Sequence, residues 1–350
     1  MNWGALIGLL ALQVAYGVAV GPWRWRFAGA NGGSVPPPVR GRRVGCFYGG
    51  VLALAVALIS PLEDLAGSLQ SVHMVQHLLL TLIAPPLLLM GTPDWLVRPA
   101  LAWRGVRPVA RRLTEAKLAF AVGNVTFVVW HIPIVYDLAL LVPPVHILEH
   151  LSLLATALLM WWPIVGMVPE LPTLSRPAQL LYVFLQTLPG ALLGIILGMA
   201  SGPLYPVYTT VPRLWGLSVM VDQQISGLIM WVGSNLFWLG VLTAVFFAWS
   251  TREEAEERAI EARAALEGPA GTARSGLEAE RSFLTRLGAG GDPGVAVAVG
   301  GQAANERPPV AIVEGDPSLG AAGLLAQLQF AGHQHFGRAR RGRDRLGVAR

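Results

Sequence analysis

Five histidines lie within or beside strongly apolar segments of the chain, although the imidazole side chain is polar and can ionise. Of the seven histidines in the sequence, these five are His73, His77, His131, His146 and His150. His73 and His77 are four residues apart, as are His146 and His150, and residues at this spacing share one face of an α-helix. Neutral imidazole binds copper, zinc, iron and nickel. Two such pairs and a fifth imidazole predict a metal site, or a haem site with imidazole axial ligands.

The segments that carry these histidines have the length and composition of membrane-spanning helices. The chain is 53% hydrophobic and only 13% charged, whereas soluble domains carry about a quarter charged residues. A spanning helix needs roughly 20 apolar residues, and runs of that length are too long for barrel strands. The sequence predicts an all-α integral membrane protein, a seven-transmembrane helix bundle within residues 1–250. The expected helices are 3–20, 44–60, 72–90, 117–136, 146–167, 178–200 and 222–249.

Basic residues alternate from one connecting loop to the next. The loops after the first, third and fifth expected helices contain arginines, whereas loops 61–71 and 137–145 contain no Lys or Arg. Loop 201–221 contains only Arg213. Cytoplasmic loops carry the excess of Lys and Arg in membrane proteins. This pattern predicts an N-terminus outside and a C-terminus in the cytoplasm.

The predicted orientation places the histidines near one surface of the membrane. His77 and His150 are each one turn, ~6 Å, below the outer end of their helices at 1.5 Å per residue. His131 is ~7 Å below the outer end of its helix by the same rise. His73 and His146 are closer to the surface. We expect the five imidazoles to be candidate ligands at the outer face, with His77 and His150 binding the same ion. The sequence leaves open whether all five share one site.

Four other residues near the outer face are candidates for supporting roles. Met74 offers a thioether, which favours Cu(I), unless the side chain faces lipid. Tyr136, Glu149 and Asp222 can hold the second ring nitrogen of a ligating histidine, or bind the ion weakly. Their alternative roles are helix capping and hydrogen bonding between helices.

The chain changes composition beyond residue 250. Residues 252–267 are highly charged and favour a helix, and the remainder is rich in Gly, Ala, Pro and Arg without a sustained period. Such a segment cannot bury enough apolar surface to offset its ordering entropy. The sequence predicts a disordered cytoplasmic tail over 251–350. The pair His333 and His335 in this tail is weak evidence for a metal site.

The histidine motifs and their neighbours resemble a known family over roughly residues 44–249. The sequence is similar to the multi-pass CtaG family of cytochrome c oxidase (caa3-type) assembly factors. The segments that carry the resemblance are His73–His77, Ala84–Pro93, Trp130–Asp137, His146–His150 and Asp222–Trp231.

This resemblance implies a non-enzymatic plasma-membrane protein that assists oxidase assembly by supplying or inserting copper. The implied partners are oxidase subunits and another copper carrier. It also implies that the five histidines are candidate ligands, with Asp222 as a weaker one.

The net charge of +5 fits an arginine-rich cytoplasmic face against anionic lipid and does not indicate nucleic-acid binding.

Two other functions are compatible with the sequence. Imidazoles on two helices at one depth could be the axial ligands of a haem in an electron-transfer protein. The segment His146-x-x-Glu149-His150 matches the H-x-x-E-H pattern of zinc hydrolases, in which the glutamate acts as general base. Copper, haem and zinc therefore remain open as cofactors from the sequence.

Overall fold

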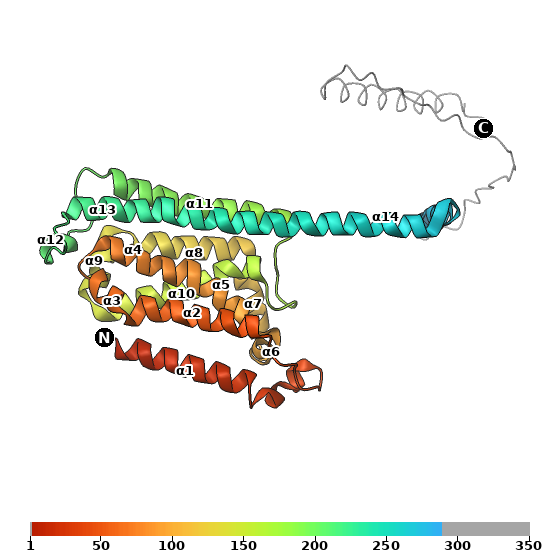
Figure 1. The fold of residues 1–350 in the computed structure, drawn as a ribbon, viewed down its shortest axis with the longest axis horizontal. Helices are drawn as coiled ribbons and strands as arrows, with labels where there is room; N and C mark the ends of the chain where they lie inside the picture. The colour runs from red at the N-terminus through yellow and green to blue at the C-terminus, as the bar shows by residue number, and fades with distance from the viewer. Residues whose placement is uncertain (1, 289–350) are drawn as a thin grey trace, which may run out of the picture. The chain divides into compact units, whose positions relative to one another are not determined.

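The computed structural model describes residues 2–288, and this part of the chain contains helices and no strand (Figure 1). Six helices in these residues are long and apolar enough to cross a membrane, and there are seven such spans if the bent pair α7–α8 is counted as one. The prediction of an all-α membrane bundle is confirmed, with six or seven candidate spans. The spans are α1 (Trp3–Val20), α2 (Gly41–Ile59), α4–η3–α5 (Gln70–Gly91), α7 (Val106–Leu113) with α8 (Ala116–Trp130), α10 (Pro143–Val165), α11 (Arg176–Met199) and α13–η4–α14 (Val219–Arg263).

The fourth span ends earlier than the predicted range 117–136. Helix α8 ends at Trp130, and His131 is its C-terminal cap. The cause is Pro133, which has no backbone N–H and disfavours a helical conformation of the preceding residue. Ile132 is accordingly extended, and Pro133 begins the separate helix α9 (Pro133–Leu141). His131 therefore lies at a helix terminus rather than inside a span.

The third span is the most enclosed helix of the bundle. In its most apolar stretch 61% of the residues are buried, against 11% for α1. Its second half, α5 (Ala84–Gly91), packs closely on α2. A Cβ atom at Gly91 would overlap the backbone of Phe47, so only glycine permits this approach. The Tyr16 hydroxyl from α1 donates to the Gly91 carbonyl oxygen at 2.9 Å.

A π-helical turn interrupts the third span directly after its histidines. This turn, η3 (Leu79–Ile83), lies between α4 (Gln70–Leu78) and α5. Pro85 and Pro86 follow it, and proline removes a backbone donor and clashes with the carbonyl four residues earlier. The Thr81 carbonyl is satisfied instead by the Trp161 indole N–H at 2.9 Å. A second π-turn, η4 (Ile229–Gly233), lies between α13 (Val219–Leu228) and α14.

Three short helical segments lie at one end of the bundle, the end that carries the histidines (Figure 1). They are α3 (Pro61–Ala66), α9 and α12 (Val207–Thr210). Helix α3 begins with Ser60, whose hydroxyl accepts from the Leu62 N–H at 3.1 Å, followed by Pro61 at the first helical position. These segments supply Tyr136, Tyr208 and the Ala66 carbonyl, whose contacts are described below. The connection between the third and fourth spans contains α6 (Asp94–Leu101).

The last helix extends further than predicted. Helix α14 (Ser234–Gly288) continues beyond the charged stretch 252–267. Residues 268–288 are therefore helical where the sequence predicted a disordered tail. The physical reason is that extending an existing helix costs far less than nucleating one. Residues 289–350, including His333 and His335, lie outside the described residues.

Glycines allow α11 and α13 to cross at backbone contact, and we expect a single methyl group to disrupt this crossing. A Cβ on Gly194 would lie 2.6 Å from the Gly227 carbonyl oxygen and 2.7 Å from the Trp231 nitrogen. Gly194→Ala should destabilise the protein by roughly 1–3 kcal/mol because the helices must separate. Thermal unfolding in detergent measures this loss. Gly198→Ala, one turn along the same helix, is the matched control because its Cβ would meet nothing within 4 Å. Equal unfolding midpoints for the two variants would contradict this account of the crossing.

Candidate metal centre

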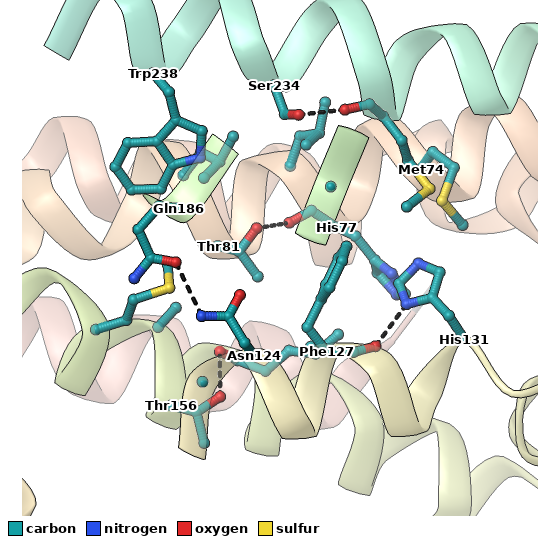
Figure 2. Close-up of a pocket in the computed structure, with 18 residues that line it drawn as sticks. Met74, His77, Thr81, Asn124, Phe127, His131, Thr156, Gln186, Ser234 and Trp238 are labelled. Carbon is teal, nitrogen blue, oxygen red and sulfur yellow. Dashed lines mark hydrogen bonds between the residues drawn. The ribbon is translucent and has the colours of Figure 1, made fainter. Parts of the chain in front are cut away.

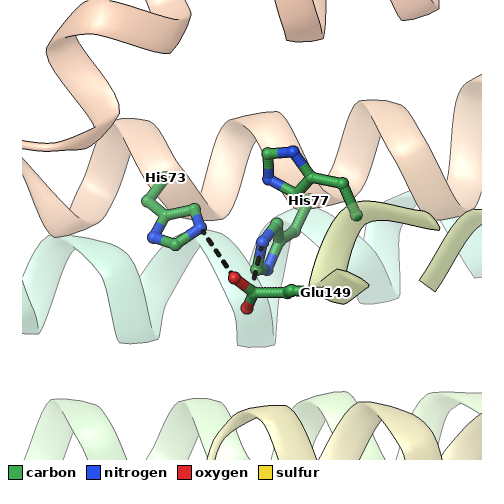
Figure 3. Close-up of side chains that lie close together, drawn as sticks. His73, His77 and Glu149 are labelled. Atoms are coloured by element: carbon green, nitrogen blue, oxygen red, sulfur yellow. Dashed lines mark ion pairs between the residues drawn. The ribbon is translucent and has the colours of Figure 1, made fainter. Parts of the chain in front are cut away.

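Three histidines and one glutamate form a buried cluster between two helices. His73 and His77 come from α4, and Glu149 and His150 come from α10 (Figure 3). Each residue offers one ligand atom, and the four atoms lie within 4.8 Å of one another. Imidazole and carboxylate atoms bind zinc-sized ions at about 2.0–2.2 Å, so ligands on opposite sides of one ion are about 4.4 Å apart. The cluster therefore matches a single ion after small side-chain adjustments.

Glu149 lies at the centre of this cluster and is fully buried. Its Oε1 is 3.5 Å from Nε2 of His77, and its Oε2 is 4.0 Å from Nε2 of His73 (Figure 3). Neither carboxylate oxygen has a hydrogen-bond partner among the described residues. An ionised carboxylate is costly to bury without compensation. A cation between these side chains would supply that compensation.

Two tyrosine hydroxyls lie against Nδ1 of His73 and orient its ring. Nδ1 of His73 lies 2.8 Å from the Tyr136 hydroxyl, which is 3.0 Å from the Tyr208 hydroxyl. The Tyr208 hydroxyl donates to the Ala66 carbonyl oxygen at 3.2 Å. Nδ1 of His73 is also 3.2 Å from the Tyr208 hydroxyl. In the tautomer that carries the proton on Nδ1, Nδ1–H donates to Tyr136, Tyr136 donates to Tyr208, and Tyr208 donates to the carbonyl. This arrangement leaves the Nε2 lone pair of His73 directed at Glu149. Hydrogen bonds of this kind set which nitrogen of a ligating histidine is free.

Burial supports the role of Tyr208 as the hydrogen-bond donor to the Ala66 carbonyl. Tyr208 is 1% exposed, and burial raises the pKa of its phenol well above the usual range. The phenol therefore keeps its proton and donates it. The sequence interpretation missed Tyr208, and also Tyr205, whose hydroxyl donates to the His131 carbonyl oxygen at 3.0 Å. The only signal was two tyrosines in a loop that faces the predicted histidine layer.

The structure brings the rings of all five predicted histidines together, but it does not give them equal positions. The ring of His146 lies 4.2 Å from that of His150 and 5.6 Å from that of His73. The ring of His131 lies 6.2 Å from that of His77. Neither His146 nor His131 belongs to the group of four whose ligand atoms converge. Glu149 takes the place in this group that the sequence assigned to a further histidine.

Asp222 has a different role from the weak ligand considered from the sequence. It is fully buried and accepts from the backbone N–H groups of Gln70 at 2.8 Å and Ser71 at 3.1 Å. Its Oδ1 also accepts from the Ser71 hydroxyl at 2.5 Å. Asp222 therefore caps the first turn of α4 from another helix. This contact holds the turn that carries His73, and no sequence signal links positions so far apart.

A cavity of about 70 Å³ adjoins the cluster. His77 and His131 line it together with Asn124 and Gln186, which are joined by a 3.0 Å hydrogen bond (Figure 2). The sequence left open whether the Met74 side chain faces lipid or the site. This side chain is 1% exposed and lines the cavity. A water molecule needs roughly 10–15 Å³ of such space, so the cavity has room for a small ligand or several waters.

Comparisons with known proteins bear on the family of this chain and not on individual residues of the site. The family described as "Cytochrome c oxidase caa3 assembly factor" matches residues 14–252. The chain is 30% identical over 270 residues to "Uncharacterized protein ML1998" of Mycobacterium leprae (strain TN), an alignment that covers 71% of the chain and 39% of the relative. It is 25% identical over 300 residues to "Uncharacterized protein Mb0105" of Mycobacterium bovis (strain ATCC BAA-935 / AF2122/97), covering 81% of the chain and 44% of the relative. The chain thus spans less than half the length of these two relatives. No solved structure matches it significantly.

Proposed function

Since this chain belongs to the family of cytochrome c oxidase caa3 assembly factors, we propose that it binds copper at the cluster formed by His73, His77, Glu149 and His150 and assists copper insertion into the oxidase. The protein acts as an assembly factor and not as an enzyme. Its partners in this role are oxidase subunits and a copper carrier that delivers the ion.

The observation that carries the proposal is the set of buried polar atoms without hydrogen-bond partners. In the described residues these are Nε2 of His73, both ring nitrogens of His77, Nε2 of His150 and both oxygens of Glu149. Buried polar groups have partners in the great majority of native structures, and each exception needs an explanation. One cation between the four side chains satisfies most of these lone pairs at once.

The ligand set favours copper among the ions that imidazole binds. Three imidazoles and a carboxylate suit zinc, copper and iron, and affinity for divalent ions at such sites reaches its maximum at Cu²⁺. The resemblance to assembly factors that supply copper to the oxidase points to the same ion. Tyr136 supports this site by orienting the ring of His73 through a 2.8 Å hydrogen bond.

The geometry supports the two alternative functions less well. A haem would occupy the plane between two axial imidazoles, and here a third imidazole and Glu149 converge on the same point. A zinc hydrolase of the H-x-x-E-H type would use His146 and His150 as ligands and keep the glutamate as a base. Instead Glu149 lies between His73 and His77, and His146 is outside the convergent group.

Metal analysis of the full chain tests the proposal. The protein is purified in detergent, stripped with a chelator, incubated with Cu(II) and desalted. We expect about one copper per chain, with an affinity that falls at acid pH because ligands must be deprotonated to bind. Iron with a haem absorbance band would favour the electron-transfer function, and retention of zinc but not copper would favour the hydrolase. Retention of no metal would overturn the proposed site.

The proposal also places the cluster at the outer face of the plasma membrane, and cysteine labelling tests this orientation. In a Cys46→Ala background, Asp64→Cys and Arg104→Cys introduce thiols at exposed positions of two connecting segments. A membrane-impermeant maleimide should label the cysteine at position 64 in intact cells, because α3 lies at the histidine end. The cysteine at position 104 should react only after permeabilisation. The reverse pattern would place the cluster on the cytoplasmic side.

A further inference from the structure

The cavity beside the cluster contains a second set of metal-binding atoms. Met74, Met160 and Met230 line it together with His131, and Figure 2 shows Met74 and His131 at this cavity. Met74 precedes His77 by three residues on α4, and side chains at this spacing are neighbours on a helix. Met74 and Met230 are 1% and 3% exposed and pack in the same buried group. Two thioether side chains of one buried group therefore line the same cavity as His131.

His131 has a free lone pair that the four-residue cluster does not use. Its Nδ1 lies 2.7 Å from the Phe127 carbonyl oxygen, so this nitrogen carries the proton and donates it. The other nitrogen, Nε2, accepts no hydrogen bond among the described residues, and the side chain is buried. His131 therefore lines the cavity and has an imidazole lone pair without a partner. The carbonyl also fixes the ring in this orientation, as the outer partners of ligating histidines do.

We propose that Nε2 of His131 and the thioethers of Met74 and Met230 form a second metal site, which takes Cu(I). Thioethers are soft ligands that select Cu(I), whereas carboxylates suit harder ions. The Cu(I) site therefore differs in preference from the cluster that contains Glu149. The cavity adjoins His77, a member of that cluster, so the two sites are neighbours. The inference rests on the proposed copper function, and Cu(I) binds at the second site without a change of oxidation state.

Copper X-ray absorption of the full chain tests the second site. The stripped protein in detergent is loaded anaerobically with Cu(I), supplied as its acetonitrile complex. We expect about two Cu(I) ions per chain and a sulfur contribution to the copper spectrum. Met74→Leu and Met230→Leu conserve volume, which cores tolerate well, and each should reduce the sulfur contribution and lose the second ion. Met199→Leu is the control, since Met199 is 81% exposed and does not line the cavity.

The same experiment on selenomethionine-labelled protein needs no substitution. A selenium neighbour in the copper spectrum would support the site even if a leucine variant folds poorly. One bound copper without sulfur or selenium neighbours would overturn the Cu(I) site and leave the proposed function intact. A sulfur contribution that is undiminished in both leucine variants would also overturn it. Absence of any bound copper would contradict the proposed function itself.

Discussion

Replacing Glu149 by glutamine is expected to abolish copper retention while the metal-free protein keeps at least its original stability. The amide has nearly the same volume as the carboxylate but carries no negative charge. The fall in copper affinity should exceed the roughly 10- to 100-fold fall that follows loss of a residue hydrogen-bonded to a ligand. In the metal-free protein, the carboxylate is buried beside His73 and His77 without a hydrogen bond. An amide can donate to the free imidazole lone pairs, so the variant relieves an unfavourable burial.

Copper per chain and thermal unfolding with and without copper measure the two effects. At a copper concentration 100 times the dissociation constant, binding stabilises the wild type by about 2.7 kcal/mol, and we expect no such gain in Glu149→Gln. Glu170→Gln makes the same chemical change at a partly exposed carboxylate paired with Arg98, and it should behave as the wild type does. If the Glu149→Gln protein retained copper, the Glu149 carboxylate would not be a ligand of the ion.

Replacing Tyr136, which contacts the ligand His73 but not the ion, should lower copper affinity less than replacing Glu149 does. Tyr136→Phe removes the hydroxyl that lies 2.8 Å from His73 Nδ1 and 3.0 Å from the Tyr208 hydroxyl. The ring of His73 then keeps only its longer 3.2 Å contact with the Tyr208 hydroxyl, and we expect copper affinity to fall roughly 10- to 100-fold. Competition with a chelator of known affinity measures this change. An unchanged affinity would show that the tyrosine pair has only a packing role.

The membrane spans and the level of the histidines followed from local sequence properties. Apolar runs of sufficient length predict spans regardless of their neighbours, and helical spacing sets the depth of His77 and His150 along their helices. The rotation of α10 about its own axis could not be predicted, because packing against other helices sets it. This rotation directs Glu149 and His150 at His73 and His77, and leaves His146 at the edge of the cluster.

Other parts of the site depend on contacts between distant segments. Pro133 was visible in the sequence, and its effect on Ile132 explains why α8 ends before the predicted boundary. The tyrosine pair was not predictable, because Tyr136 and Tyr208 lie on α9 and α12 and meet only in the folded protein. The same holds for Asp222, whose partners lie about 150 residues earlier in the chain. Its predicted position near the outer face suggested a ligand, whereas tertiary structure makes it a helix cap.

Replacing Asp222 by alanine is expected to destabilise the protein strongly and to weaken copper binding at the same time. The carboxylate accepts three hydrogen bonds, from the Gln70 N–H at 2.8 Å, the Ser71 N–H at 3.1 Å and the Ser71 hydroxyl at 2.5 Å. Its negative charge also faces the positive end of the α4 helix dipole. Removing it leaves buried donors without partners, each costing about 1–3 kcal/mol. We expect a loss of roughly 3–5 kcal/mol, as for breaking other buried charged contacts.

Hydrogen exchange and thermal unfolding distinguish the effect of Asp222→Ala from that of losing a solvent-exposed helix cap. The amides of Gln70 and Ser71 should exchange much faster in Asp222→Ala, because the first turn of α4 loses its only side-chain cap. His73 lies one turn further along, so disorder in that turn lowers copper affinity without touching a ligand. Ser218→Ala removes the solvent-exposed cap of α13, whose hydroxyl accepts from the Val221 N–H at 3.2 Å. That control should cost only about 1 kcal/mol and leave copper affinity unchanged. If Asp222→Ala were no less stable than Ser218→Ala, the aspartate would not be holding α4 in place.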